Sequence, residues 1–328
     1  MRIYLAAVSQ LYSNGGKNWP MAEGPAHLHR VLLSYHPGFK NNEKLQIALQ
    51  RADEPIDYCV DSGAHIWLAS YFKHNKKAPI AEVEATLARF IASIRAMPRK
   101  PSFVVELDLQ RIYGMDVVDA WRRDLWQPFE RETGIPVCYV WHRVDGTPKW
   151  RSMLEDSGIN YLGLSGDRSI GTEIRAALVL EAYKAGKPVH GFASVDTSWM
   201  KKVPFYSVDS TSWAVGAQVF GLAPTFDPVA GKIRQVHVGN REFKHAPRKA
   251  AANLMKARNF YASDILEKKD GKKNYPRFFG AAGDVFRKLE EWHTAWWVSK
   301  GLDWEAQLRR HNNVIGGSRG GHVQAPRV

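Results

Sequence analysis

Short apolar runs that alternate with amphipathic helical patterns are the feature that most constrains the fold of this chain. The runs are rich in Val, Ile, Tyr and Phe, and there are eight of them, at 2–9, 56–62, 102–109, 136–142, 160–166, 188–195, 205–210 and 232–239. Several show almost no polar–apolar alternation, which suits strands that are buried on both faces of a parallel sheet. Helical patterns between them include 81–97, 117–133 and 171–186.

This alternation predicts an α/β protein and favours a closed (β/α)₈ barrel of the TIM type. The rival architecture is a doubly wound open sheet, but no GxGxxG motif follows the first run. A length of 328 residues suits one barrel and an extension. We predict a catalytic barrel over residues 1–240 and a basic, mostly helical extension over 241–328 that packs on it.

Cysteine content and hydropathy indicate the cellular compartment in which the protein is expected. The two cysteines, Cys59 and Cys138, lie in predicted strands, where cysteine is usually a small apolar filler that a cytoplasm keeps reduced. They exclude a disulfide framework and a four-cysteine zinc site. No stretch approaches the roughly 18 uninterrupted apolar residues of a membrane span. We expect MRIYLAAVSQLY to be a first strand and not a signal peptide, and the protein to be soluble and cytoplasmic, with no membrane partner.

The positive charge is concentrated in the last third of the chain. Of the net charge of +13, residues 1–227 carry +2 and residues 228–328 carry +11. Such a segment is typical of a surface that binds a polyanion, although a basic face that is merely solvated is the alternative. Its KKDGKK stretch is expected to be an exposed turn between helices. The predicted nucleic-acid contacts are Lys268, Lys269, Lys272, Lys273 and Arg277.

Three of the apolar runs end in an aspartate: Asp61, Asp108 and Asp209. Catalytic side chains of a TIM barrel come from the C-terminal ends of its strands. Each aspartate alone could cap a helix or a turn, but three on different strands would converge on one pocket. Polar or small residues lie beside them or at other strand ends, and these are candidates for contacts in that pocket: Ser62, Gly63, His142, Gly163, His190 and Ser210.

A family resemblance rests on several strand-end motifs. The most specific is FYSVDSTSW at 205–213, and the others are the strand with DSGA at 60–64, the LDL strand at 107–109, and the YLGLSG and VHGFASV strands. Over about residues 1–225 the chain resembles the tRNA-guanine transglycosylase superfamily. It is most similar to the DNA-directed branch, the deazapurine DNA modification protein A family of phages and bacterial genomic islands. For a phage-encoded member the expected location is the host cytoplasm.

The resemblance implies that guanine in a polynucleotide is exchanged for a free 7-deazaguanine base, such as the 7-cyano form, without a redox cofactor or ATP. It assigns Asp209 as the nucleophile of a covalent aspartyl-glycosyl intermediate, Asp61 as the acid/base and Asp108 as a reader of the base. A carboxylate that attacks C1′ and a carboxyl group that protonates the leaving base repeat the logic of retaining glycosidases.

The chain also departs from the family pattern. Where the transglycosylase motif continues as GGFQ, this chain has Gly63, Ala64, His65 and Ile66. The tRNA enzymes hold a structural zinc with three cysteines and a histidine, and two cysteines cannot form that site. No zinc is therefore expected, and DNA is favoured over RNA as the polymer. The alternatives are an RNA transglycosylase, a non-catalytic nucleic-acid-binding barrel, and a glycosidase, which would have Glu106 as its sole strand-end glutamate.

Overall fold

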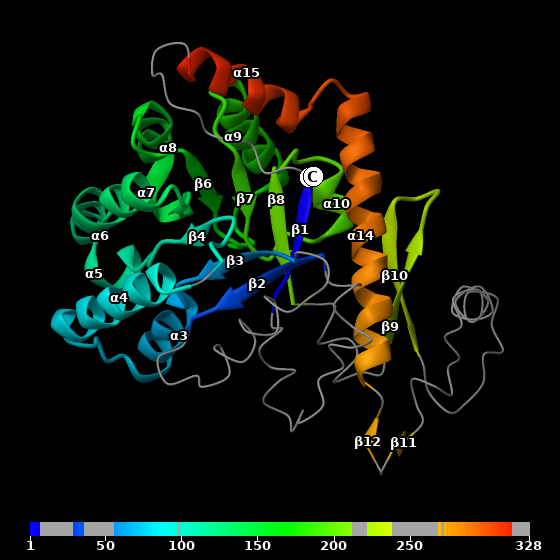
Figure 1. Ribbon diagram of the computed structural model, residues 1–328, viewed down its shortest axis with the longest axis horizontal. Coiled ribbons are helices and arrows are strands. Elements are labelled where there is room, and N and C mark those ends of the chain that lie inside the picture. The colour runs from blue at the N-terminus through cyan, green and yellow to red at the C-terminus, as the bar shows by residue number, and fades with distance from the viewer. Residues whose placement is uncertain are drawn as a thin grey trace.

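A closed barrel of parallel strands forms the body of the protein. The computed structural model describes residues 1–6, 29–35, 56–97, 99–211, 222–237, 268–269, 272–273 and 275–316. Eight strands close the barrel in their order along the chain (Figure 1). They are β1 (Arg2–Leu5), β2 (Arg30–Ser34), β3 (Asp57–Asp61), β4 (Val104–Val105), β5 (Val137–Trp141), β6 (Tyr161–Leu164), β7 (Val189–Gly191) and β8 (Ser207–Ser210). The predicted (β/α)₈ barrel is confirmed.

Helices cover the outside of the barrel where the amphipathic patterns predict them. The pattern at 81–97 forms α4 (Ile80–Arg95), and that at 171–186 forms α9 (Thr172–Lys184). The pattern at 117–133 is interrupted, because a π-helical turn, η2 (Arg122–Trp126), joins α6 (Met115–Trp121) to α7 (Gln127–Thr133). The described residues of the barrel also form α3 (Ala64–His74), α5 (Gln110–Tyr113), η3 (Arg143–Asp145), α8 (Gly146–Glu155) and α10 (Thr197–Met200).

One predicted barrel strand is wrong and one was missed. The run at 232–239 lies outside the barrel, because β10 (Lys232–His237) pairs antiparallel with β9 (Leu222–Asp227). Only Ile233 and Val236 of its six residues are apolar, which suits a half-exposed antiparallel strand better than a strand that is buried on both faces. The missing barrel strand is β2, whose RVLLS sequence is short and has few apolar neighbours.

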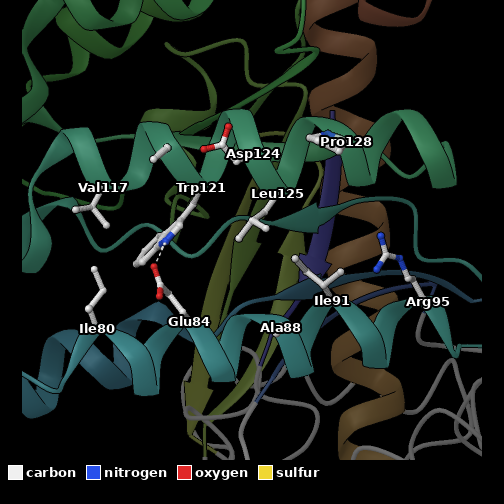
Figure 2. Close-up of a pocket in the computed structure, with 11 residues that line it drawn as sticks. Ile80, Glu84, Ala88, Ile91, Arg95, Val117, Trp121, Asp124, Leu125 and Pro128 are labelled. Carbon is white, nitrogen blue, oxygen red and sulfur yellow. Dashed lines mark hydrogen bonds between the residues drawn. The ribbon is translucent and has the colours of Figure 1, made fainter.

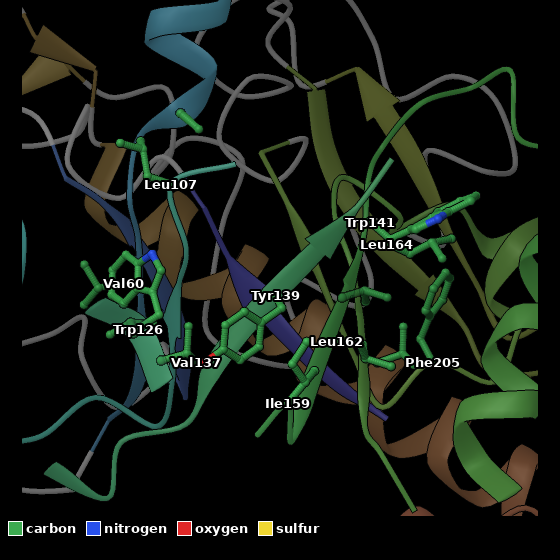
Figure 3. Close-up of a cluster of buried hydrophobic side chains, with 14 of the residues drawn as sticks. Val60, Leu107, Trp126, Val137, Tyr139, Trp141, Ile159, Leu162, Leu164 and Phe205 are labelled. Carbon is green, nitrogen blue, oxygen red and sulfur yellow. The ribbon is translucent and has the colours of Figure 1, made fainter. Parts of the chain in front are cut away.

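Side chains on the two faces of the strands form two core layers. The inward layer fills the barrel with Tyr4, Leu32, Phe103 and Val140 and with the two free cysteines. The outward layer packs between strands and helices, as Figure 3 shows for Val137, Tyr139 and Leu162 together with Trp126 from η2. Cys59 and Cys138 are fully buried, as the sequence predicts.

The C-terminal helices complete the wall and the floor of the barrel. Helix α14 (Tyr275–Ser299) lies between the barrel and the β9–β10 hairpin (Figure 1). Its tryptophans anchor it, since Trp297 Nε1 donates to the Met200 carbonyl and Trp292 Nε1 donates to the Pro228 carbonyl, both at 2.9 Å. Helix α15 (Trp304–Gly316) covers the amino ends of the strands, where Trp304 donates to the carbonyl of Pro204 at 2.7 Å.

A charged network fastens α14 to the amino ends of β1, β2 and β3. Glu290 accepts from the Ile3 amide at 2.7 Å and from Arg30 Nε at 3.1 Å. Arg30 also pairs with Asp57, which accepts from the Tyr4 hydroxyl. Burial alone would raise the pKa of Glu290, but the hydrogen bond from His29 and the charge of Arg30 outweigh it and lower that pKa. Both carboxylates at this end are therefore compensated by a cation.

The KKDGKK stretch, predicted as an exposed turn, contains two short paired strands. Lys268–Lys269 (β11) and Lys272–Lys273 (β12) pair antiparallel, so the lysines lie on a short hairpin ahead of α14. The side chains of these four lysines and of Arg277 lie outside the described residues. No helix in the described part of the chain is long and apolar enough to cross a membrane.

Candidate active site

The three strand-end aspartates lie together at the carboxyl end of the barrel. Asp61 is the last residue of β3, Asp209 is in β8, and Asp108 follows β4 by three residues. All three are largely buried, and the charges of Asp108 and Asp209 both act on Asp61. The convergence predicted from their positions in the sequence is therefore present in the structure.

The carboxyl group of Asp61 has a strongly raised pKa. Burial, followed by the negative charges of Asp108 and Asp209, raises its pKa to about 7. Hydrogen bonds from the Gly63 amide and the Ser34 hydroxyl oppose this rise only in part. The exposed imidazole of His65 is one helical turn further on, with Nδ1 at 3.8 Å from Asp61 Oδ2. A carboxyl group with such a pKa can both donate and accept a proton near neutral pH.

Gly63 allows the chain to turn directly after Asp61. It adopts a left-handed conformation with φ 77° and precedes the first residue of α3. A Cβ atom there would lie 2.3 Å from the carbonyl oxygen of Tyr35, so both its conformation and its contact require glycine. The neighbouring Ser62 is buried and donates to the carbonyl of Glu106 at 2.7 Å, which ties the β3 end to the β4 end.

Asp209 is held by two donors that reach the same oxygen. Its Oδ1 accepts from the Ala193 amide at 2.7 Å and lies 3.3 Å from His190 Nε2. Ala193 has φ 49°, a conformation that an L-residue with a side chain rarely adopts. This backbone strain directs an amide at the carboxylate, and such strain is typical of functional sites.

A buried chain of hydrogen bonds extends from Asp209 into the barrel. His190 Nδ1 lies 2.6 Å from Ser207 Oγ, which lies 2.5 Å from the Tyr161 hydroxyl. Because a carboxylate can only accept, Nε2 of His190 carries the proton and Nδ1 accepts from Ser207. Tyr161 then donates to Ser207. His190, predicted as a base contact, is fully buried and is a partner of the Asp209 carboxylate.

Asp108 forms a second carboxylate–histidine pair. Its Oδ2 lies 2.7 Å from His142 Nε2. Burial lowers the pKa of His142, but the hydrogen bond and the charge of Asp108 outweigh it and raise that pKa. Asp145 fixes the backbone of His142 through a 2.7 Å bond to its amide and also accepts from Gln110 at 3.2 Å. His142 therefore orients Asp108.

The other two predicted contact residues, Gly163 and Ser210, lie on β6 and β8. Gly163 is in the interior layer, where a Cβ atom would meet Phe192 at 2.8 Å and Cys138 at 3.0 Å, so its role in the structure is to admit these side chains. Ser210 follows Asp209, is buried, and accepts from the Ala6 amide through its carbonyl at 2.9 Å.

Several residues of the site escaped the sequence analysis. Gln110 Oε1, at the start of α5, and Ser165 Oγ, directly after β6, are buried and have no hydrogen-bond partner among the described residues. Gln110 follows the predicted strand at 102–109 and Ser165 lies near the end of the one at 160–166, and these positions are the signal that could have identified them. Ser207 could have been found because it is two residues before Asp209 in the same strand and therefore points to the same side. No local sequence pattern indicates that the amide of Ala193 donates to Asp209.

Glu106, the strand-end glutamate of the carbohydrate alternative, is sealed from solvent. It accepts from Arg122 Nε at 2.8 Å and from the Val140 amide at 2.7 Å, and no part of it is exposed. It is therefore an internal tie between β4, β5 and η2. Among the described residues, no three His, Cys, Asp or Glu side chains are placed to hold a metal ion.

A groove of about 680 Å³ lies elsewhere, on the outer wall of the barrel. Figure 2 shows it between α4 and the α6–η2–α7 segment, with Trp121 Nε1 donating to Glu84 at 3.2 Å. Its lining is mainly aliphatic and includes none of the three aspartates.

Comparison with family models, with curated proteins and with solved structures found no match for the chain.

Proposed function

We propose that the protein is a DNA guanine transglycosylase that exchanges guanine for a free 7-deazaguanine base. The observation that carries this proposal is that the carboxyl groups of Asp61 and Asp209 lie near each other in different chemical surroundings. Asp61 has a pKa of about 7 and can hold a proton, whereas Asp209 accepts hydrogen bonds from an amide and an imidazole. Carboxyl groups with divergent environments are how one site supplies both an acid and a nucleophile.

In the first step Asp209 attacks C1′ of the target deoxyribose. A C–O bond forms as the bond from C1′ to N9 of guanine breaks, and the electron pair of that bond leaves with the base. The protonated Asp61 donates a proton to the departing guanine. Neither hydrogen bond to Asp209 uses Oδ2, and we assign this oxygen as the attacking atom.

In the second step the incoming base displaces Asp209. Its N9 attacks C1′, the ester bond to Asp209 breaks, and Asp61 takes up the N9 proton of the base. The polymer then contains the new base, and both carboxyl groups return to their first protonation states. The exchange needs no net oxidant, reductant or nucleotide triphosphate.

Asp108 is the proposed reader of the base. An ionised carboxylate accepts from the N1–H and N2–H₂ edge that guanine and 7-deazaguanines share. His142 holds one of its oxygens. The buried, unpartnered Gln110 Oε1 and Ser165 Oγ supply further polar atoms to this side of the site, which fits a small heterocycle with donors and acceptors at its rim.

A mass-detected exchange assay tests the function. The protein is incubated with 7-cyano-7-deazaguanine and either guanine-containing DNA or tRNA, and the polymer is then digested to nucleosides. We expect the modified deoxynucleoside from DNA. Incorporation into tRNA alone would assign the protein to RNA, and incorporation into neither polymer would refute the transglycosylase proposal.

A further inference from the structure

A line of exposed cations lies on the rim of the barrel beside the aspartates. It runs over the segments that follow β3, β4, β5 and β6, and we call it the basic rim: Lys73, Lys76, Lys77, Arg111, Arg143 and Arg168. All six residues are exposed. The four segments that hold them, 73–77, 110–113, 142–146 and 165–171, contain only two acidic residues, Asp145 and Asp167. The rim is therefore strongly positive, although residues 1–227 as a whole are nearly neutral.

Contacts between the segments make the rim continuous. The guanidinium of Arg111 on α5 lies 4.8 Å from the ring of Phe72 on α3, and Lys77 Nζ lies 4.4 Å from the ring of Tyr113. Arg143 Nη1 donates to the Ser169 carbonyl at 2.8 Å, which connects the β5 segment to the β6 segment.

The pKa of Asp167 shows that Arg111 and Arg143 both lie near this carboxylate. The hydrogen bonds from Ser169 lower its pKa first, and the charges of Arg111 and Arg143 lower it further. The charges of cations from two different segments therefore act on one partly exposed carboxylate. In the described part of the chain, no carboxylate lies within 4.0 Å of Lys73, Lys77, Arg111 or Arg168.

Arg175 gives the β6 segment a rigid base. It is completely buried and donates to three backbone carbonyls of this segment, those of Ser165, Asp167 and Ile170. Its guanidinium also lies 4.6 Å from the ring of Trp199. Such an arrangement holds Arg168 on an ordered loop, and an ordered loop loses less conformational entropy when it binds a ligand.

We infer that the basic rim binds the sugar–phosphate backbone of the nucleic acid whose base enters the aspartate site. This inference rests on the proposed function. Cations without carboxylate partners bind phosphates with little competition, and arginine suits them because its fork can reach two oxygens. The exposed ring of Phe72, 56% accessible beside Arg111, offers a face for a neighbouring base. The polymer is thus held at the barrel mouth as well as at any surface in the last third of the chain.

The test compares two triple variants of the full chain with the same change in charge. The rim variant is Arg111→Gln, Arg143→Gln, Arg168→Gln. The control is Arg89→Gln, Arg123→Gln, Arg151→Gln, which removes three exposed arginines from outer helices. Binding of a labelled single-stranded DNA oligonucleotide and of tRNA is measured by fluorescence anisotropy over a range of salt concentrations, and thermal unfolding verifies that each variant folds.

We expect the rim variant to bind both polymers about 100-fold more weakly at 0.1 M salt and to lose about 2 from its salt slope, since each single-strand phosphate contact contributes about 0.7. The control should stay within about 3-fold of the parent protein, as the effect of general charge is small. An unchanged slope in the rim variant overturns the inference, as does an equal loss in the control.

Failure of the proposed function would look different. Binding needs no chemistry, so a protein that binds through the rim but exchanges no base refutes only the enzyme. A protein that exchanges base while its rim variant binds normally refutes only the rim. Replacing Lys268, Lys269, Lys272 and Lys273 by Gln tests the hairpin surface in the same assay, and a loss there with none in the rim variant would place the contact on the hairpin instead.

Discussion

The two ends of the barrel treat buried charge in opposite ways. At the amino end, the carboxylates of Asp57 and Glu290 share Arg30, and Glu290 also accepts from a backbone amide. At the carboxyl end, the carboxylates of Asp61, Asp108 and Asp209 each have an imidazole nitrogen of a histidine within 4.0 Å. Among the described residues, no Lys or Arg nitrogen lies within 4.0 Å of these three carboxylates.

The pKa values follow this difference. That of Glu290 is lowered, while that of Asp61 is raised to about 7. A buried carboxylate with a cation stabilises the fold, whereas like charges held together without one oppose it. The amino end is therefore built for stability, and the carboxyl end retains a cost that only function explains.

The largest effect that should separate the two ends comes from Asp209→Asn. This change removes the proposed nucleophile, so exchange should fall on the order of 10⁴-fold. The amide oxygen can still accept from Ala193, and one like charge is removed, so the free energy of unfolding should not decrease. Exchange is measured by nucleoside mass and stability by urea unfolding. Normal exchange by this variant would contradict the nucleophile assignment.

Glu290→Gln should show the reverse pattern. It leaves Arg30 with a single carboxylate and should lower the free energy of unfolding by about 3 kcal/mol, while exchange per folded molecule stays unchanged. The matched control is Glu132→Gln, which breaks the exposed pair with Arg95 and should cost less than about 1 kcal/mol. Urea titrations of both variants measure the difference. An equal loss of unfolding free energy in the two variants would show that the Glu290–Arg30 network stabilises the fold no more than a surface ion pair does.

These two ends were not equally predictable from the sequence. Asp61, Asp108 and Asp209 stand out because each ends an apolar run, and the architecture brings strand ends together. Arg30 and Glu290 are 260 residues apart, in a strand that was missed and in a helix that was assigned to an extension. Local patterns carry no information about which distant partner compensates a charge.

The error over β2 and β10 has the same origin. Eight apolar runs favoured a barrel, yet one of them, 232–239, is an antiparallel strand outside it, and β2 took its place. The content of apolar side chains distinguishes the two kinds of strand, because β10 has two apolar residues among its six whereas β1, β5 and β6 are almost wholly apolar. The strained amide of Ala193 could not be predicted, since nothing about an alanine indicates φ 49°.

The third prediction uses pH to distinguish the ends. Asp61 has a folded-state pKa of about 7 against an ordinary value of 3.8, so the folded protein binds the extra proton between these values. Its burial therefore destabilises the fold increasingly as pH rises from about 4 to 7, and the full cost is present above 7. Asp61→Asn should accordingly stabilise the protein by about 2 kcal/mol at pH 8 and by little at pH 4.

Glu290 has the opposite sign. Its lowered pKa contributes stability above the ordinary value of 4.5, which is lost in acid. Urea unfolding at pH 4, 6 and 8 measures both effects, and a gain for Asp61→Asn that does not depend on pH would contradict the raised pKa. Exchange by the parent protein should decline above pH 7, where Asp61 no longer holds the proton for the leaving base.

The smallest expected effect concerns the histidine under the nucleophile. His190→Leu removes the donor to Asp209 and leaves Ser207 without its acceptor, so kcat should fall about 10-fold. His190→Gln can place an amide N–H near the position of Nε2 and should recover to within about 3-fold of the parent protein.

The readout that separates positioning from mere packing is the division of the effect between kcat and KM. Recovery of kcat in His190→Gln would identify the lost hydrogen bond to Asp209 as the cause, because the amide can donate although its shape differs from that of imidazole. The KM for the free base should stay constant in both variants, because His190 is fully buried beneath Asp209. A raised KM with an unchanged kcat would instead make His190 part of the base site, as predicted from the sequence.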